Sequence, residues 1–223
     1  MTLSLADVVP LHLADLTYPA GHPLAGQDGD VYAFVIRHPD GPILVDTGIG
    51  EGDEWIERHY RPRRRALVDA LRAAGVAIGD VARIVNTHLH FDHCGQNRRF
   101  PAVAIHVQRD ELGAASGSGY TVTEWFDFPG AAYLSLDGDA EVARGVRALA
   151  TPGHTAGHQS VVVETSEGSV VIAGHAIYSF DEYVGRTPPE DTSEPARASA
   201  ERLRELRPRR VLFSHDARAW DAT

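Results

Sequence analysis

One short run of polar residues constrains this chain more than any other feature of its sequence. Residues 88–93 read His-Leu-His-Phe-Asp-His and directly follow the apolar run Val81–Asn86, which is typical of a buried strand. Neutral imidazole nitrogens and carboxylate oxygens are the usual ligands of zinc and similar divalent ions. Four such side chains packed together without an ion would be costly, because each loses its contact with water. The run therefore predicts a metal-binding loop that two ions can share.

Three further histidines follow strand-like runs. His154 lies in the segment Thr-Pro-Gly-His-Thr, and His175 and His215 each come just after a short apolar run. Each of these histidines alone is more typical of an ordinary surface or core position than of a ligand. Their repeated placement after strands favours one shared site.

The rest of the chain predicts short strands with helices between them. Turn residues at 38–41 join two strands as a hairpin. The mixed order favours two packed sheets flanked by helices, in a single domain spanning residues 1–223. The expected strands are Ser4–Leu11, Val31–Arg37, Pro42–Asp46, Val81–Asn86, Val103–Val107, Gly145–Ala150, Ser160–Glu164, Ser169–Ala173 and Arg210–Phe213, and the expected helices are Pro62–Ala74, Gln108–Ala114 and Pro195–Leu206.

Composition narrows the classes of function. Twenty-one basic residues against 31 acidic ones give a net charge of -10, the opposite of the basic surface that nucleic-acid binding requires. No apolar run approaches the roughly 20 residues of a membrane-spanning helix, and the N-terminus lacks the pattern of a signal peptide. The single cysteine cannot form an intramolecular disulfide. We therefore expect a cytoplasmic protein without nucleic-acid or membrane partners.

The segment Ser116–Ala131 has little periodicity and carries several aromatic residues, among them Trp125, Phe126 and Phe128. Such a loop can line an apolar pocket that would suit an acyl chain, or its rings can cover a corner of the core. The sequence leaves both interpretations open.

Taken together, these motifs resemble the metallo-β-lactamase superfamily, whose signature is His-x-His-x-Asp-His followed by separate His, Asp and His ligands. The resemblance spans nearly the whole chain and includes Asp-Thr-Gly at 46–48 and Phe-Ser-His-Asp at 213–216. It implies an α+β fold, an αββα sandwich of two mixed β-sheets flanked by helices, with the metals at one edge. It also implies two ligand sets, His88, His90 and His154 around one ion and Asp92, His93 and His215 around the other.

Within the superfamily, the short C-terminus after His215 and the segment His175–Tyr178 are most similar to the N-acyl homoserine lactonase branch. In that branch a tyrosine three residues beyond the bridging aspartate contacts the carbonyl or leaving oxygen of the substrate, and Tyr178 matches it. A phenol can donate a hydrogen bond to developing negative charge. A packed aromatic residue is the alternative interpretation of Tyr178.

The chain departs from the family pattern at one ligand. Where the family has an aspartate that bridges two metals, this sequence has His175, whose neutral ring offers a single lone pair. The change removes one negative charge, which weakens the second ion unless another group compensates. We expect two divalent ions, zinc in the first place, with His175 as a ligand. A site with one ion is an alternative, and so are iron, cobalt, manganese or nickel in place of zinc. A further alternative is a hydroxide that bridges two metal ions, which would make the metal pair more electrophilic.

Other polar residues near the motifs have supporting roles in this interpretation. Asp46 is expected to accept a hydrogen bond from a ligand histidine, with capping of the turn that follows it as the alternative. His158 is expected to stabilise the His154 loop, and Cys94 to pack as a small residue rather than to bind metal.

These features predict a hydrolase that opens the ester ring of a lactone similar to N-acyl homoserine lactones. Metal would lower the pKa of a bound water, the hydroxide would attack the carbonyl, Tyr178 would stabilise the oxyanion, and Asp92 would accept or relay the proton. Because one fold hosts many chemistries, an ester, thioester or phosphoester hydrolase and a mononuclear iron oxidoreductase of the persulfide dioxygenase type are alternatives. A catalytically silent binding protein is another. The expected partner is a small lactone or ester, and the resemblance leaves a homodimer open.

Overall fold

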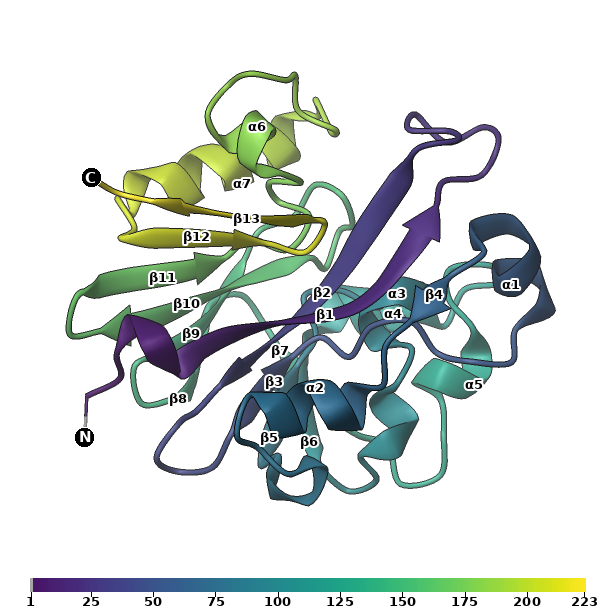
Figure 1. Ribbon diagram of the computed structural model, residues 1–223, viewed down its shortest axis with the longest axis horizontal. Coiled ribbons are helices and arrows are strands. Elements are labelled where there is room, and N and C mark those ends of the chain that lie inside the picture. Colours follow the sequence, from purple (N-terminus) through teal and green to yellow (C-terminus); the bar gives the residue numbers. More distant parts are fainter. Residues whose placement is uncertain (1) are drawn as a thin grey trace.

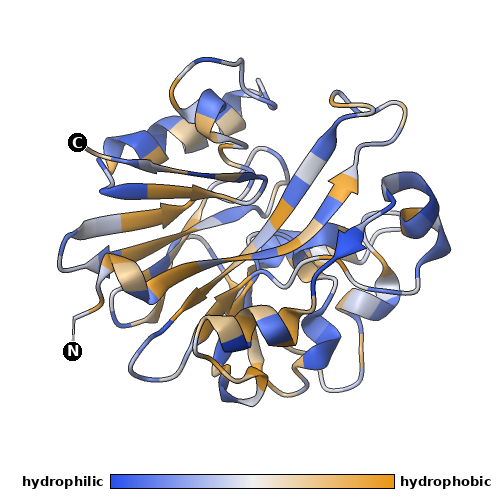
Figure 2. Ribbon diagram, in the orientation of Figure 1, coloured by the Kyte–Doolittle hydropathy of each residue, from blue (hydrophilic) through white to orange (hydrophobic). Residues whose placement is uncertain are grey.

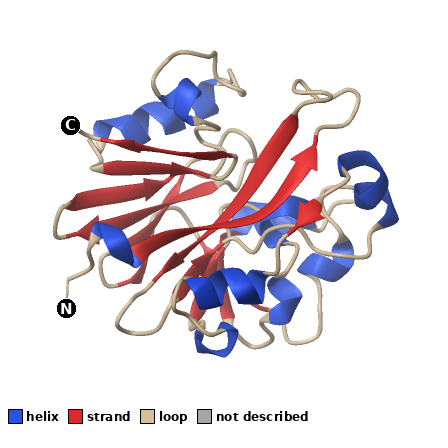
Figure 3. Cartoon of the chain, in the orientation of Figure 1, coloured by secondary structure: helices blue, strands red, loops and turns tan. Residues whose placement is uncertain are grey.

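Two β-sheets lie face to face and carry helices on their outer sides in the computed structural model, which describes residues 2–223 (Figure 1 and Figure 3). One sheet has seven strands in the order β4-β1-β2-β3-β5-β6-β7, and the other has six in the order β13-β12-β11-β10-β9-β8. Both sheets contain parallel and antiparallel pairs. The predicted αββα sandwich of two mixed sheets is confirmed.

The N-terminal part of the chain builds the first sheet. The predicted hairpin is confirmed, since β2 and β3 pair antiparallel, and β5 lies between β3 and β6, parallel to both. Parallel pairing places the ends of these short strands at one edge of the sheet. The strands of this sheet are β1 (Val8–Thr17), β2 (Asp28–Ile36), β3 (Ile43–Val45), β4 (Arg63–Arg64), β5 (Arg83–Val85), β6 (Ala104–Gln108) and β7 (Ala132–Leu136).

The C-terminal part builds the second sheet. Its one parallel pair, β11 and β12, is joined by a crossover that contains the helix α7 (Glu194–Glu205). Ser193 caps this helix, since its side chain accepts a hydrogen bond from the backbone N–H of Ala196. The strands are β8 (Ala140–Ala143), β9 (Val146–Ala150), β10 (Gln159–Thr165), β11 (Gly168–Ile172), β12 (Arg210–Phe213) and β13 (Asp216–Asp221).

The remaining helical elements are short. None of the helices in residues 2–223 combines the length and the apolar character that a bilayer crossing requires. These elements are η1 (Leu5–Asp7), α1 (Glu54–Tyr60), α2 (Leu67–Ala73), η2 (Ile78–Asp80), α3 (Phe91–Cys94), η3 (Asn97–Arg99), α4 (Arg109–Ala115), α5 (Thr123–Phe126) and α6 (Phe180–Tyr183).

Apolar side chains fill the space between the sheets and the space under the outer helices. Phe34 and Val85 of the first sheet belong to the same buried cluster as Val161 and Ile172 of the second. Figure 2 shows that hydrophobic residues are concentrated in the strands, whereas the helices carry both hydrophilic and hydrophobic residues. Helix α2 covers the outer face of the first sheet, and α7 buries Leu203 against the second. The packed sheets thereby fix the positions of the strand ends from which the loops at their edge begin.

Several predicted boundaries need correction. The predicted strand Ser4–Leu11 begins with η1, and its extended part continues to Thr17. The predicted helix Pro62–Ala74 starts only at Leu67, because Arg63 and Arg64 pair with β1 instead. The predicted loop Ser116–Ala131 contains the short helix α5. Helix α1 and the strands β7, β8 and β13 were not predicted, since none has a clear period in the sequence.

Candidate metal centre

Four segments that are distant in the sequence meet at one edge of the sandwich. His88 follows β5 of the first sheet, while His154, His175 and His215 follow β9, β11 and β12 of the second. The strands are held in place by the core between the sheets. The side chains at their ends are therefore brought together by both sheets at once, as the sequence predicted from their positions after apolar runs.

The loop at residues 88–93 turns sharply from β5 into α3. His90 is the N-cap residue of α3, and its carbonyl accepts hydrogen bonds from the backbone N–H groups of His93 and Cys94 at 3.0 and 3.1 Å. The turn directs the side chains of residues 88–93 to neighbouring points instead of to opposite faces. His88 and His93 have no exposed surface, and Asp92 is 8% exposed.

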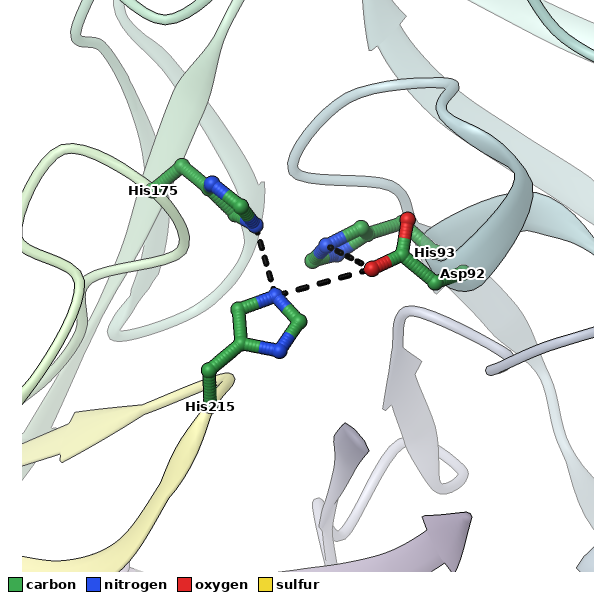
Figure 4. Close-up of side chains that lie close together, drawn as sticks. All are labelled: Asp92, His93, His175 and His215. Carbon is green, nitrogen blue, oxygen red and sulfur yellow. Dashed lines mark hydrogen bonds and ion pairs between the residues drawn. The ribbon is translucent and has the colours of Figure 1, made fainter. Parts of the chain in front are cut away.

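One group of possible ligands consists of Asp92, His93, His175 and His215 (Figure 4). Oδ2 of Asp92 lies 3.6 Å from Nε2 of His93 and 3.6 Å from Nε2 of His215. Nε2 of His175 approaches Nε2 of His215 to 2.6 Å. Figure 4 shows the four side chains pointing toward one another, Asp92 and His93 from one segment and His175 and His215 each from another. One carboxylate oxygen and three ring nitrogens thus face a common point.

A second group consists of His88, His90 and His154. Nε2 of His154 lies 3.1 Å from Nδ1 of His90, close to the about 3.3 Å between two nitrogens that bind one zinc ion tetrahedrally at about 2.0–2.1 Å. The rings of His154 and His175 stack at a centroid distance of 4.0 Å, so the two groups lie side by side. Every histidine and aspartate predicted to bind metal belongs to one of these groups.

Two ring nitrogens show that these groups fit divalent cations. Nε2 of His88 and Nε2 of His93 are buried and have no hydrogen-bond partner in residues 2–223. Such nitrogens are costly unless something binds them. Burial lowers the pKa of His154 to about 2, with further lowering by the surrounding histidines. Burial also lowers the pKa of His215 to about 4, although the carboxylate of Asp92 acts against it. These rings are therefore neutral at pH 7 and offer the lone pairs that a metal requires.

Other buried groups hold the candidate ligands in position. Oδ2 of Asp46 lies 2.8 Å from Nδ1 of His93, and the same carboxylate accepts hydrogen bonds from the backbone N–H and the hydroxyl of Thr87. This geometry agrees with the role expected for Asp46 as the partner of a ligand histidine. Nδ1 of His215 lies 2.7 Å from the carbonyl oxygen of Asp30. Partners of this kind fix which ring nitrogen faces the metal.

His158 supports a neighbouring ligand directly. Its Nε2 accepts a hydrogen bond from the backbone N–H of His175 at 2.9 Å, and its Nδ1 lies 3.0 Å from the carbonyl oxygen of Thr151. Gly174, with a φ of +60°, makes the turn possible, because a Cβ there would lie 2.5 Å from Nε2 of His158. His158 therefore connects the segment that carries His154 with the one that carries His175.

A fully buried carboxylate that the sequence did not single out joins two ligand loops. Glu111 of α4 accepts hydrogen bonds from the backbone N–H of Leu89 at 2.7 Å and from the hydroxyl of Thr155 at 2.6 Å. It also accepts one from the hydroxyl of Tyr120. Leu89 lies between His88 and His90, and Thr155 follows His154. Glu111 therefore links the two segments that carry the three candidate ligands of the second group.

Cys94 and three aromatic residues of the predicted loop do not line the cavity beside the candidate ligands, whereas the ring of Tyr120 lies 4.7 Å from that of His90. Cys94 belongs to neither ligand group, and its thiol donates to the carbonyl oxygen of Leu89 at 3.3 Å. Burial raises the pKa of this thiol to about 12, which agrees with the packing role expected for it. Trp125 and Phe128 are 2% and 8% exposed and pack in the core, and Phe126 lies beside Tyr133. The interpretation that these three rings line a pocket is wrong.

Other residues form the cavity next to the candidate ligands. A cavity of about 280 Å³ is lined by His90, Asp92 and His215 together with Tyr18 and Tyr178. A neighbouring cavity of about 450 Å³ shares four of its lining residues, namely Trp55, Phe91, Gly119 and Tyr120. Residues 119–124 line the second cavity, and Tyr120, one of the aromatic residues of the predicted loop, lines both cavities, so the segment 116–131 does contribute a wall.

Tyr178 faces the first cavity. Its ring stacks on that of His215 at 4.9 Å between centroids, and its hydroxyl contacts the hydroxyl of Tyr18. Burial and the carboxylate of Asp92 raise the pKa of Tyr18, which therefore stays a neutral hydrogen-bond donor. Tyr18, Trp55 and Glu190 also line this cavity. These three residues were not predicted, because each comes from a segment without a motif.

Both the sequence and the fold of this chain are similar to those of known proteins. The sequence profile of the Metallo-beta-lactamase superfamily matches residues 26–215. An N-acyl homoserine lactonase from a Bacillus species is 35% identical over 206 residues, which cover 85% of this chain and 82% of the relative.

Two solved structures are similar in fold. One is a variant of AiiA from B. thuringiensis with N-decanoyl-L-homoserine bound at the active site, with a TM-score of 0.81 and 29% identity over 97% of this chain and 95% of the other. A second is an N-acyl homoserine lactone hydrolase with the product N-hexanoyl-L-homoserine at its catalytic metal centre, with a TM-score of 0.80, 30% identity and the same coverage.

Proposed function

The chain belongs to the metallo-β-lactamase superfamily, and from that membership we propose that it is a metal-dependent hydrolase that opens the ring of N-acyl homoserine lactones. One observation carries the proposal. Two adjacent groups of ligand side chains lie at the wall of a cavity that also presents the hydroxyl of Tyr178. The relatives named as N-acyl homoserine lactonases support the same substrate class.

The metal-binding residues of the proposal are those predicted from the sequence. His88, His90 and His154 would hold one ion, and Asp92, His93, His175 and His215 would hold the other. We propose zinc, because imidazole with a single carboxylate is a donor set that suits this ion. Bound divalent metal would supply a Lewis acid and lower the pKa of water at the site. Because the ligands come from both sheets, residues 1–223 are proposed to act as one domain.

The side chains around the cavity have separate tasks in this proposal. The hydroxyl of Tyr178 would donate a hydrogen bond to the carbonyl or leaving oxygen of the lactone, where negative charge develops. Tyr18 would orient that hydroxyl through their contact. Asp92 would accept the proton of the attacking water, because it lines the cavity and its side chain is 12% exposed.

The neighbouring cavity would receive the acyl chain. Trp55, Ile56, Phe91 and Val122 give it apolar walls, and Trp55 is 57% exposed. An acyl chain on these walls would bury apolar surface at a gain of roughly 25 cal/mol per Å². The proposal therefore predicts a preference for acylated lactones over the bare ring.

The proposal is tested with the purified full chain. Metal content is measured by elemental analysis, and the zinc-loaded protein is then assayed with homoserine lactones that carry acyl chains of different length. Acid release at constant pH follows ring opening, and a His88→Ala variant serves as the metal-binding control. Hydrolysis that requires metal and is lost in the variant is expected. A fully loaded protein that leaves these lactones intact but cleaves an ester, thioester or phosphoester would overturn the substrate assignment, and iron with oxygen uptake would overturn the reaction class.

A further inference from the structure

The two ligand groups contain six histidines and a single carboxylate, Asp92. Neutral imidazoles bring no charge to balance two divalent cations, so a further anionic group near the centre would strengthen binding. His175 lies at the boundary of the groups, since its Nε2 approaches His215 and its ring stacks on that of His154. A compensating carboxylate would therefore be most effective beside His175.

Glu190 occupies that place. It lies in the segment 184–193 between α6 and α7, and its Oε2 is 3.5 Å from Nδ1 of His175. The side chain of Glu190 is only 23% exposed, although the residue as a whole is exposed, so the carboxylate points inward. Oxygen and ring nitrogens of Glu190, His154 and His175 all lie within 4.8 Å of one another.

The other nitrogen of His175 explains what Glu190 can do there. Nδ1 of His175 is buried and makes no hydrogen bond in residues 2–223, since Oε2 of Glu190 is near it but not yet bonded, while Nε2 points to His215. A histidine that binds metal through one nitrogen commonly donates its other N–H to a carboxylate. His93 already has this arrangement with Asp46. Glu190 faces Nδ1 of His175 as Asp46 faces Nδ1 of His93, although at 3.5 Å instead of 2.8 Å.

We propose that Glu190 completes the metal centre by accepting the Nδ1–H of His175 and by lending the centre a second carboxylate. The inference rests on the proposed function only in placing metal at these ligands. Glu190 is a positioning residue, since it acts through His175. Its contact turns Nε2 of His175 toward the point shared with His215, and its charge offsets the excess of neutral ligands.

Metal affinity tests the inference without reference to turnover. Zinc binding to the full chain is measured by competition with a chromophoric chelator for Glu190→Ala and Glu190→Gln. Loss of affinity of about 10–100-fold for one ion is expected in Glu190→Ala, the range seen when partners of ligand histidines are removed. Glu190→Gln keeps an oxygen that can accept the N–H but lacks the charge, so a smaller loss is expected. Glu194→Gln, an exposed change at the start of α7, is the matched control and should bind zinc like the wild type.

A double substitution identifies His175 as the residue through which Glu190 acts. His175→Asp places a carboxylate at the ligand position itself, so in that background Glu190→Gln should change zinc affinity less than in the wild type. Equal losses in the two backgrounds, or wild-type affinity in both Glu190 variants, would overturn the inference. Circular dichroism of the metal-free variants checks that the fold is kept.

The outcomes separate the inference from the proposed function. If the Glu190 variants lose zinc but the loaded wild type hydrolyses no lactone, the inference stands and the proposed function fails. If the wild type hydrolyses lactones and the variants bind zinc as it does, the proposed function stands and the inference fails. A wild type that binds no zinc, cobalt, manganese or iron overturns both.

Discussion

Oδ2 of Asp46 lies 2.8 Å from Nδ1 of His93, and both side chains are completely buried. The carboxylate fixes the ring so that Nε2 of His93 faces the candidate metal site. Asp46→Asn replaces one carboxylate oxygen by an amide NH₂ group. That group cannot accept a hydrogen bond, and its N–H would face another N–H, either that of His93 or that of Thr87. We expect metal affinity to fall about 10–100-fold. Zinc competition measures it, with the exposed Asp69→Asn as control, and unchanged affinity would contradict this role.

Tyr178 tests the chemical step. Tyr178→Phe removes the hydroxyl that faces the cavity but keeps the ring that stacks on His215. Because removal of one donor to an oxyanion costs about 10²–10³ in kcat, a fall of this order is expected with the metal content unchanged. Steady-state kinetics with one lactone and elemental analysis measure the two quantities. A variant with wild-type kcat would assign Tyr178 to packing.

Glu111 tests the spacing of the ligand loops. Both of its carboxylate oxygens accept hydrogen bonds, from Leu89 on one side and from Thr155 on the other. Glu111→Gln replaces one acceptor by a donor in a site without exposed surface, which should destabilise the protein by about 2–4 kcal/mol. Urea unfolding measures the loss, and zinc competition should show weaker binding to His88, His90 and His154. Glu141→Gln, at an exposed position, is the control.

Metal removal and acid should act together on stability. Burial lowers the pKa of His158 to about 3 and that of His215 to about 4. Below about pH 6.5 the unfolded chain binds protons at these rings and the folded chain does not. Each of the two rings therefore lowers the unfolding free energy by about 1.4 kcal/mol for every pH unit of acidification. Glu182, whose pKa burial raises to about 7, acts in the opposite direction between pH 7 and 4.5, as does Glu190.

His93 also opposes the loss, because the carboxylates of Asp92 and Asp46 raise its pKa against the effect of burial. Buried histidines with a lowered pKa outnumber these three groups, since His88, His154 and His175 belong to them as well. The chelator-treated chain should therefore lose stability steadily between pH 7 and 5. Urea unfolding at several pH values measures this, with the zinc-loaded chain at pH 7.5 as reference. An unfolding free energy that is constant or rises toward pH 5 would contradict the assignment.

Trp55 tests the place of the acyl chain. It lines both cavities and is 57% exposed, so Trp55→Ala should remove apolar contact area without harm to the core. We expect a clearly higher KM for long-chain lactones and a smaller change for short-chain ones, because a longer chain covers more of this wall. The ratio of kcat/KM for decanoyl and butanoyl substrates measures it. An equal effect on both would move the acyl chain elsewhere.

The sequence predicted the parts of the site that are local and missed those that depend on packing. His88, His90, Asp92 and His93 could be found because six residues after a buried strand carry the whole pattern. His215 could be found because it ends a strand. Tyr18 and Glu190 could not, since their segments have no motif and come near the ligands only when β1 and the segment before α7 are placed in three dimensions.

Periodicity failed in a similar way for parts of the fold. Arg63 and Arg64 lie beside a helical pattern yet pair with β1, because the edge of a sheet was available to them. Trp125 lies in a segment without periodicity, but its large apolar surface is 2% exposed in the core. Such outcomes depend on which neighbours the tertiary fold supplies, and local sequence does not contain them.

The ligands of the candidate centre come from both sheets, with His88 to His93 after β5 and His215 after β12. A nascent chain that has not yet reached residue 215 therefore lacks one ligand, however well its first sheet has folded. Full metal capture becomes possible only once β12 has docked beside β11. Metal uptake would thus report the completion of folding. A bound ion would also link the two sheets, so it would have to dissociate before the sheets could separate.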